Sequence, residues 1–270
     1  MTDALPAGIH VSGDAAGPAV VLLHSSQSNT GQWRDLIKRL QADYYLIGID
    51  LLGYGKAPAP EVDATEAFRF TDEVPRIVAA VEQLTQGQPL ILVGHSYGAA
   101  VALKLALENL LPVRALALFE PVAFHVLDAN DPARQEVEAI ANQMDQDDKW
   151  AATQAFVDYW NVPGYFAALP EKLQQQMASQ ADKVAMDFAA LMGEPHKLVD
   201  YRRVEVPVLL LTGARTQASA RRVAEQLQQV LPQVEVEQLA CGHMGPLTHP
   251  QLVNPLLVNF LQQVTEPSGA

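Results

Sequence analysis

Residues 90–107 read LILVGHSYGAAVALKLAL, and the order of residues in this stretch decides the fold. It opens with an apolar run typical of a buried strand and closes with a run of strong helix formers. Ser96 lies between the two runs, flanked by Gly94 and Gly98. Where a strand turns sharply into a helix, the backbones come too close for a Cβ atom, which gives both glycines a steric reason. In this setting the pattern G-x-S-x-G predicts a serine hydroxyl lifted off the sheet, beside the N-terminus of the helix.

Further strand-like runs recur at wide spacing on both sides of this stretch. They are largely apolar, and with the run at 90–93 they span residues 19–23, 44–49, 114–119, 208–211 and 234–239. Apolar residues at helical spacing lie in the intervals at 33–41, 72–84 and 221–231. Parallel strands that are covered by helices on both faces produce such an alternation. We therefore expect an α/β fold with a doubly wound, mostly parallel sheet.

The alternation of strands and helices stops between residues 119 and 206. In that interval the sequence predicts helices at 132–145, 149–160, 170–181 and 182–191. Ordinary crossover helices are the alternative, but a crossover between parallel strands needs one helix. We expect an inserted all-helical lid at residues 122–203 and a core formed by residues 1–121 and 204–270.

Composition excludes several classes of protein. The formal charge of −13 opposes binding to nucleic acid or to an anionic membrane surface, so we expect a small-molecule substrate. The single cysteine, Cys241, cannot form an internal disulfide, and no secretory signal or membrane-spanning stretch is visible. These features predict a cytoplasmic protein, and they leave its oligomeric state open.

A reactive serine needs a base, because its hydroxyl is a weak nucleophile at its free pKa. His243, in the segment CGHMGP, directly follows the strand-like run at 234–239. Parallel strands end at the same edge of a sheet, which brings this loop to the edge where Ser96 lies. No histidine has a second ligand at a convincing metal spacing, so we expect neither a metal nor a cofactor.

In these features the chain resembles the α/β-hydrolase superfamily, specifically its lidded serine esterases and C–C bond hydrolases. The resemblance covers nearly the whole sequence and is carried by the segments His24-Ser25-Ser26, 50–56, 94–98, the helical insertion and Gly242-His243. It implies an α/β-hydrolase fold in which the backbone N–H groups of Ser26 and Tyr97 bind an oxyanion. Ser25 replaces the glycine that the family usually has in this loop.

The expected acid of this family is missing from its usual place. The family has an aspartate in Gly-x-x-Asp after the strand that corresponds to 208–211, whereas this chain has Thr216 there. Glu120 closes the neighbouring strand-like run, where some superfamily members, including one branch of the haloalkane dehalogenases, carry their acid. We therefore expect Glu120 to orient His243; the alternative is a surface glutamate or an anchor of the lid.

Together these residues predict a serine hydrolase that cleaves an ester or related acyl bond through an acyl-enzyme. Ser96 would attack, His243 would transfer the proton, and Glu120 would hold the imidazole. The alternatives are a C–C bond hydrolase, a lactonase or an amidase on the same residues, and a ligand-binding pseudoenzyme, which Thr216 motivates. We expect a small, partly apolar substrate, contacted by His24, Phe124, Trp160, Tyr165 and Met244.

Overall fold

The computed structural model describes residues 5–61, 67–144 and 146–266. Its sheet has seven strands in the order β1-β3-β2-β4-β5-β6-β7, and only the pair β1–β3 is antiparallel. The strands are β1 (Ile9–Gly13), β2 (Ala19–Leu23), β3 (Tyr45–Ile49), β4 (Leu90–His95), β5 (Val113–Phe119), β6 (Val208–Gly213) and β7 (Val234–Leu239). The expected doubly wound, mostly parallel sheet is confirmed. The edge strand β1 is not among the predicted runs, because it is short and only Ile9 in it is fully buried.

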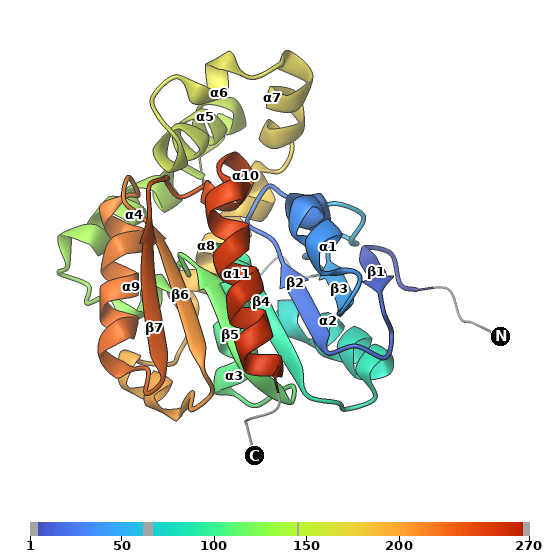
Figure 1. The fold of residues 1–270 in the computed structure, drawn as a ribbon. Helices are drawn as coiled ribbons and strands as arrows, with labels where there is room; N and C mark the ends of the chain where they lie inside the picture. Colours follow the sequence, from blue (N-terminus) through green and yellow to red (C-terminus); the bar gives the residue numbers. More distant parts are fainter. Residues whose placement is uncertain (1–4, 62–66, 145, 267–270) are drawn as a thin grey trace.

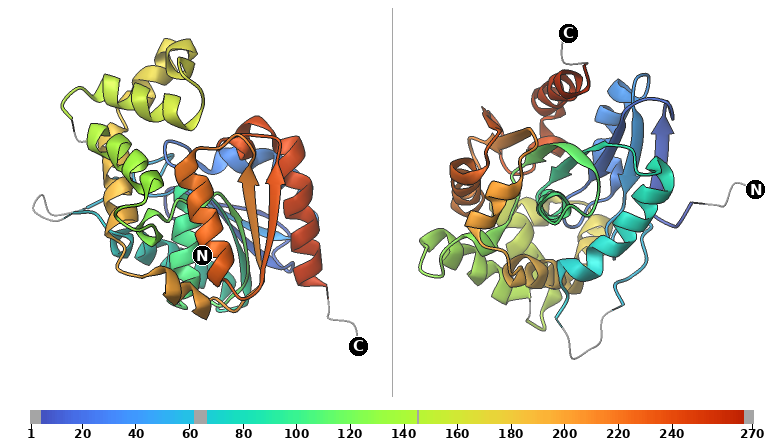
Figure 2. Two further views of the ribbon diagram at one scale, coloured as in Figure 1. Left: turned by 90° about the vertical axis from the view of Figure 1, so that its left-hand side faces the viewer. Right: turned by 90° about the horizontal axis from the view of Figure 1, so that it is seen from below.

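Helices cover both faces of this sheet, and the sheet residues alternate between two apolar cores. Leu92 of β4 packs into the core under α2 (Phe70–Thr85), α3 (Tyr97–Leu107) and α9 (Ala218–Val230). Its neighbours Ile91 and Val93 pack into the second core, under α1 (Arg34–Leu40) and α11 (Pro250–Thr265). Figure 2 shows α11 on one side of the strands and α3 and α9 on the other. Burial on both faces is the reason why β4 reads as an unbroken apolar run.

The helical insertion lies between β5 and β6 and contains no strand within its described residues. Its elements are η2 (Phe124–Val126), α4 (Pro132–Met144), α5 (Lys149–Trp160), α6 (Tyr165–Ala168), α7 (Glu171–Ala178), α8 (Ala181–Gly193) and η3 (Leu198–Arg203). All four predicted helices are present. Helix α5 has the predicted ends, α7 and α8 have shifted ends, and α4 begins at the predicted residue, while residue 145, its predicted end, lies outside the described residues. In Figure 1, α5, α6 and α7 stand beyond the end of the sheet at which β4 meets α3. The lid boundaries 122–203 stay a prediction.

The turn between β4 and α3 has the strained geometry that its two glycines predict. Ser96 has φ 55° and ψ −120°, a left-handed φ that few non-glycine residues adopt. A Cβ atom on Gly94 would lie 2.5 Å from the Cα of Ala99, and one on Gly98 would lie 2.4 Å from the carbonyl oxygen of His24. The close approach of strand and helix is thus confirmed as the reason for both glycines.

Candidate active site

Ser96 and His243 meet at the carboxyl edge of the sheet, 147 positions apart in the chain. Ser96 follows β4, and His243 lies in the loop that leaves β7. The Ser96 Oγ lies 2.9 Å from Nε2 of His243, and both side chains are buried. This distance allows the hydroxyl to donate a hydrogen bond to a neutral imidazole.

The ring of His243 is held by aromatic neighbours and by its own backbone. The Trp160 indole packs against it with a centroid separation of 4.0 Å. On another side, Nε2 of the buried His95 donates a hydrogen bond of 2.9 Å to the backbone carbonyl of His243. Burial, with repulsion from His243, lowers the pKa of His95 well below its usual value. His95 is therefore neutral and adds no competing cation beside the imidazole.

Glu120 lies directly after β5, and its carboxylate reaches the other nitrogen of His243. The distance from Oε2 to Nδ1 of His243 is 2.6 Å, and the side chain is fully buried. The Thr216 hydroxyl donates to the same oxygen at 2.6 Å, and the Gly213 N–H donates to Oε1 at 2.6 Å. Within the described residues no lysine or arginine pairs with Glu120. This environment is that of a buried acceptor for an imidazole N–H rather than that of a surface glutamate or an ion-paired anchor.

The predicted oxyanion donors are the backbone N–H groups of Ser26, which lines both cavities with Ser96, and of Tyr97, which follows Ser96 in the chain. Tyr97 is the first residue of α3, so its N–H is unused by the helix. Ser26 lies in the loop after β2 and lines the same cavities as Ser96. Among the described hydrogen bonds, no acceptor takes either N–H. Both groups are thus available to an oxygen atom on the substrate, and their role as oxyanion donors stays a prediction.

Asp187 of α8 is a buried carboxylate that contacts Ser26, and it is not among the predicted site residues. The Ser26 hydroxyl donates to Asp187 Oδ2 at 2.6 Å, and the Tyr54 hydroxyl donates to the same oxygen at 2.7 Å. The other oxygen, Oδ1, forms a close ion pair with Lys183, one helical turn earlier. Asp187 and Lys183 are opposite charges placed four residues apart on a helix whose remaining residues, apart from Asp182, are uncharged, and this spacing is the signal that could have revealed them.

Lys183 continues the network towards α2 and the serine turn. Its ammonium lies 3.5 Å from Oε2 of Glu73, which is buried and also accepts a hydrogen bond of 3.3 Å from the Tyr97 hydroxyl. The ammonium lies over the rings of Tyr54, Phe68 and Tyr97, at 4.7 to 4.9 Å from their centroids. Burial raises the pKa of Glu73. Through these side-chain contacts the insertion helix α8 is connected to Ser26 and Tyr97, the two residues predicted to donate to an oxyanion.

Two cavities have Ser96 in their walls, and they share Ser26, Phe156 and Trp160 as well. The outer pocket is lined by Ser25, Ser26, Gln27, Ser28, Ser96, Phe156, Val157, Trp160, Asn161, Tyr165, Leu169, Leu173, Met177, His243, Met244, Leu247 and Thr248. The inner cavity is lined by Ser26, Ser96, Val122, Phe124, Phe156, Trp160, Val184, Asp187, Phe188 and Leu191. Four of the predicted contact residues line a cavity, namely Phe124, Trp160, Tyr165 and Met244.

The prediction that His24 contacts the substrate is corrected by the structure, because His24 lines neither cavity. Its Nδ1 donates to the carbonyl of Ser25 at 2.7 Å, and its Nε2 accepts from the N–H of Leu51 at 2.9 Å. Complete burial lowers the pKa of His24 to about 4. Both ring nitrogens are occupied by backbone, so the side chain shapes the loop that carries Ser26 and does not face a substrate.

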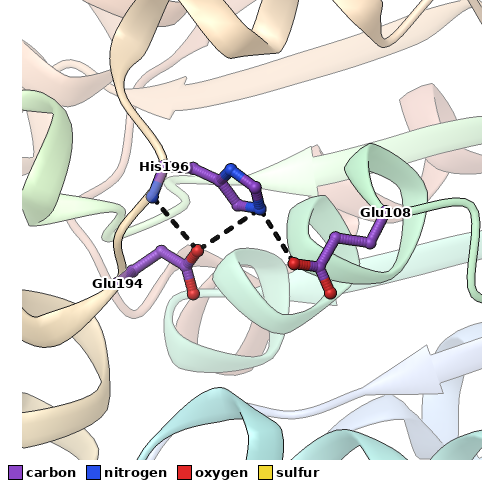
Figure 3. Close-up of side chains that lie close together, drawn as sticks. All are labelled: Glu108, Glu194 and His196. Atoms are coloured by element: carbon purple, nitrogen blue, oxygen red, sulfur yellow. Dashed lines mark hydrogen bonds and ion pairs between the residues drawn. The ribbon is translucent and has the colours of Figure 1, made fainter.

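Away from this site, one cluster of the described residues has the spacing of a metal site. Glu108, Glu194 and His196 bring a nitrogen and two carboxylate oxygens within 4.8 Å of one another (Figure 3). The Lys104 ammonium lies 2.7 Å from Glu108 and 3.1 Å from Glu194. One ammonium already pairs with both carboxylates, so the cluster is explained as an ion-pair network.

The comparisons with known proteins agree with this fold. Residues 20–256 match the family described as the alpha/beta hydrolase family, and the chain belongs to that family. It is 25% identical over 261 residues to a 2-(acetamidomethylene)succinate hydrolase of Mesorhizobium japonicum, which covers 94% of this chain and 91% of that protein. An esterase from Exiguobacterium antarcticum has the same fold, with a TM-score of 0.72, 22% identity and coverage of 95% and 96%.

A haloalkane dehalogenase of Agrobacterium fabrum is 33% identical over 114 residues, but the match covers only 42% of this chain and 36% of that protein. The likeness is therefore restricted to part of the fold. No helix among the described residues is long and apolar enough to cross a membrane.

Proposed function

We propose that the protein is a serine hydrolase that cleaves carboxylic esters of small, uncharged, partly apolar substrates. The observation that carries the proposal is the unbroken chain of hydrogen bonds from Ser96 through His243 to Glu120. In the first step Ser96 attacks the carbonyl carbon while Nε2 of His243 takes its proton. The Glu120 carboxylate holds the Nδ1 proton and stabilises the imidazolium that forms.

The negative charge that develops on the carbonyl oxygen is bound by the N–H groups of Ser26 and Tyr97, supported by the N-terminus of α3. His243 then returns the proton to the leaving oxygen, and the alcohol departs. Water, activated by the same imidazole, releases the acid from Ser96.

The alternatives to an esterase differ in how far the residues of the site distinguish them from it. Dehalogenase chemistry uses a carboxylate nucleophile, and this chain has Ser96. A C–C bond hydrolase or a lactonase could use the same three residues. One relative's name refers to a succinate, which is a dianion, whereas among the described residues no lysine or arginine lines either cavity. The pseudoenzyme alternative depends on the lack of an acid at Thr216, and the contact between Glu120 and His243 removes that motive.

The test is labelling with a fluorophosphonate together with hydrolysis of p-nitrophenyl acetate. We expect one covalent adduct on Ser96 and turnover of the ester, both lost in Ser96→Ala. Labelling without turnover would favour the pseudoenzyme, and turnover that survives Ser96→Ala would contradict the mechanism. A cytoplasmic location stays a prediction based on composition.

A further inference from the structure

The two cavities beside Ser96 differ in size, in charge and in their access to His243. We propose that the inner cavity is the acyl-binding site and accepts only short, uncharged acyl groups, whereas the outer pocket holds the alcohol. This assignment rests on the proposed serine hydrolase function and adds to it the orientation and the class of the substrate.

The orientation follows from the position of the imidazole. Ser96 and Ser26 line both cavities, so the carbonyl group lies where the cavities meet. His243 lines only the outer pocket. Because His243 must give its proton to the leaving oxygen, the alcohol lies on the side of the outer pocket. The acyl carbon chain extends away from the leaving oxygen, and we assign it to the inner cavity because His243 does not line that cavity.

The size of the inner cavity limits the acyl chain. Its volume is about 20 Å³, against about 240 Å³ for the outer pocket. Phe124 and Phe188 close it, with their rings stacked at a centroid separation of 6.3 Å, and Leu191 lies beside them. All three side chains are buried in the packed core. A cavity of this volume holds a group about the size of a methyl, as in an acetyl ester, whereas each added methylene has to displace these side chains.

The charge of the inner cavity excludes acids as acyl groups. Asp187 is the one charged residue among its lining residues, and its partners are Lys183, Ser26 and Tyr54. Lys183 is already shared between Asp187 and Glu73, so no cation is left to receive a second carboxylate. An anionic acyl group would be desolvated beside Asp187 without a partner.

The first experiment keeps the alcohol constant and varies the acyl group. We expect kcat/KM for p-nitrophenyl acetate and butyrate to exceed that for the octanoate by about a hundredfold or more. The mono-p-nitrophenyl ester of succinic acid, which is close to butyrate in size but charged, should be slower than butyrate by a similar factor. Equal rates for butyrate and octanoate, or for butyrate and the succinate ester, would overturn the assignment.

The second experiment opens the cavity. Phe188 separates it from an outer groove between α4 and α8 that Ala185, Ala189 and Met192 line. We expect Phe188→Ala to raise the ratio of octanoate to butyrate kcat/KM by about tenfold or more. Leu191→Ala, a smaller change in the same wall, should shift the ratio in the same direction and serves if Phe188→Ala does not fold.

The matched control is Leu173→Ala, in the wall of the outer pocket. It should leave the acyl ratio unchanged and alter the preference between small and bulky alcohols of butyrate esters. An acyl ratio that responds to Leu173→Ala and not to Phe188→Ala or Leu191→Ala would show the opposite orientation and refute the proposal.

Phosphonate probes separate this proposal from the proposed function. If a methyl and an octyl fluorophosphonate label Ser96 equally fast and esters are turned over, the protein is a serine hydrolase and the acyl assignment is wrong. If neither probe labels Ser96 and no ester is hydrolysed, both proposals are wrong. Selective labelling by the methyl probe supports both.

Discussion

The acid that contacts His243 follows a different strand from the one that the family resemblance implies. Glu120 and Thr216 follow neighbouring parallel strands, β5 and β6, so their side chains meet at the same edge of the sheet. Thr216 stands at the usual acid position of the family, and here its hydroxyl donates to Oε2 of Glu120. Glu120 has a φ of 45°, a strained value that the buried hydrogen bonds of its carboxylate stabilise.

The first prediction concerns this carboxylate. Replacing Glu120 with Gln removes the negative charge that stabilises the imidazolium while keeping the shape of the side chain. We expect kcat to fall by about 10⁴. Near-normal activity with p-nitrophenyl acetate, in a variant whose circular dichroism is unchanged, would exclude Glu120 as the orienting acid.

A second prediction tests whether the site tolerates the usual acid position. In Glu120→Gln combined with Thr216→Asp, a carboxylate returns beside the one that was lost, since the two side chains are in hydrogen-bond contact. We expect kcat to rise by about tenfold or more over the single variant Glu120→Gln. Thr216→Asp alone is the matched control and should lower kcat, because it places two carboxylates side by side.

At the scale of elements, helix α8 contributes both to the inner cavity and to the buried network beside it, and Asp187 belongs to both. Val184, Phe188 and Leu191 line the inner cavity, while Lys183 and Asp187 enter the buried network under Ser26 and Tyr97. The 3.6-residue period of the helix brings Lys183 and Asp187 together and keeps them beside the apolar wall. Helix α8 thus forms part of the wall of the inner cavity and, through Asp187, also contacts the loop that carries Ser26, a predicted oxyanion donor.

The third prediction compares two aspartates of α8. Asp187 is buried, whereas Asp182 pairs with Lys149 across the surface and its side chain is 74% exposed. We expect Asp187→Asn to lower the free energy of unfolding by about 3 kcal/mol, because Lys183 loses its nearest anionic partner in the interior. Asp182→Asn should change it by less than about 1 kcal/mol. Urea unfolding of both variants checks this, and equal effects would show that the buried network contributes little.

At the scale of the whole molecule, buried neutral histidines make stability depend on pH. Burial lowers the pKa of His24 to about 4, against a usual value of 6.5. Below pH 6.5 the unfolded chain therefore binds a proton that the folded protein does not. The contribution of His24 to stability is complete above pH 6.5 and is lost as the pH falls towards 4.

The fourth prediction follows from this sign. Between pH 6.5 and 4, the free energy of unfolding should fall by on the order of 3 kcal/mol through His24. Urea unfolding midpoints measured across this range test it, with His24→Asn as the comparison. The variant is less stable at neutral pH because two backbone hydrogen bonds change, but its dependence on pH should be flatter. A slope equal to that of the natural protein would contradict the prediction.

The sequence alone was enough for the parallel sheet and the turn at Ser96. An unbroken apolar run such as β4 predicts a strand that is buried on both faces, without knowledge of the segments that cover it. Gly94 and Gly98 are required by close backbone contacts at the turn itself. The same is true of the helices in the insertion, whose period is a local property. The helix α11 and the strand β1 are missing from the predicted elements: β1 is mostly half-exposed, and α11 carries Pro255 and a broken apolar pattern.

The hydrogen-bond partners and the burial of the polar side chains became known only from the tertiary structure. Nothing near Asp187 in the chain predicts its contact with Ser26, which is 161 positions away, and His24 reads as a contact residue until Leu51 is seen to donate to it. The same holds for the two cavities, whose walls come from β-strand ends and insertion helices far apart in sequence. Backbone spacing and local sterics are encoded over a few residues, whereas hydrogen-bond partners, burial and cavity shape depend on which distant segments pack together.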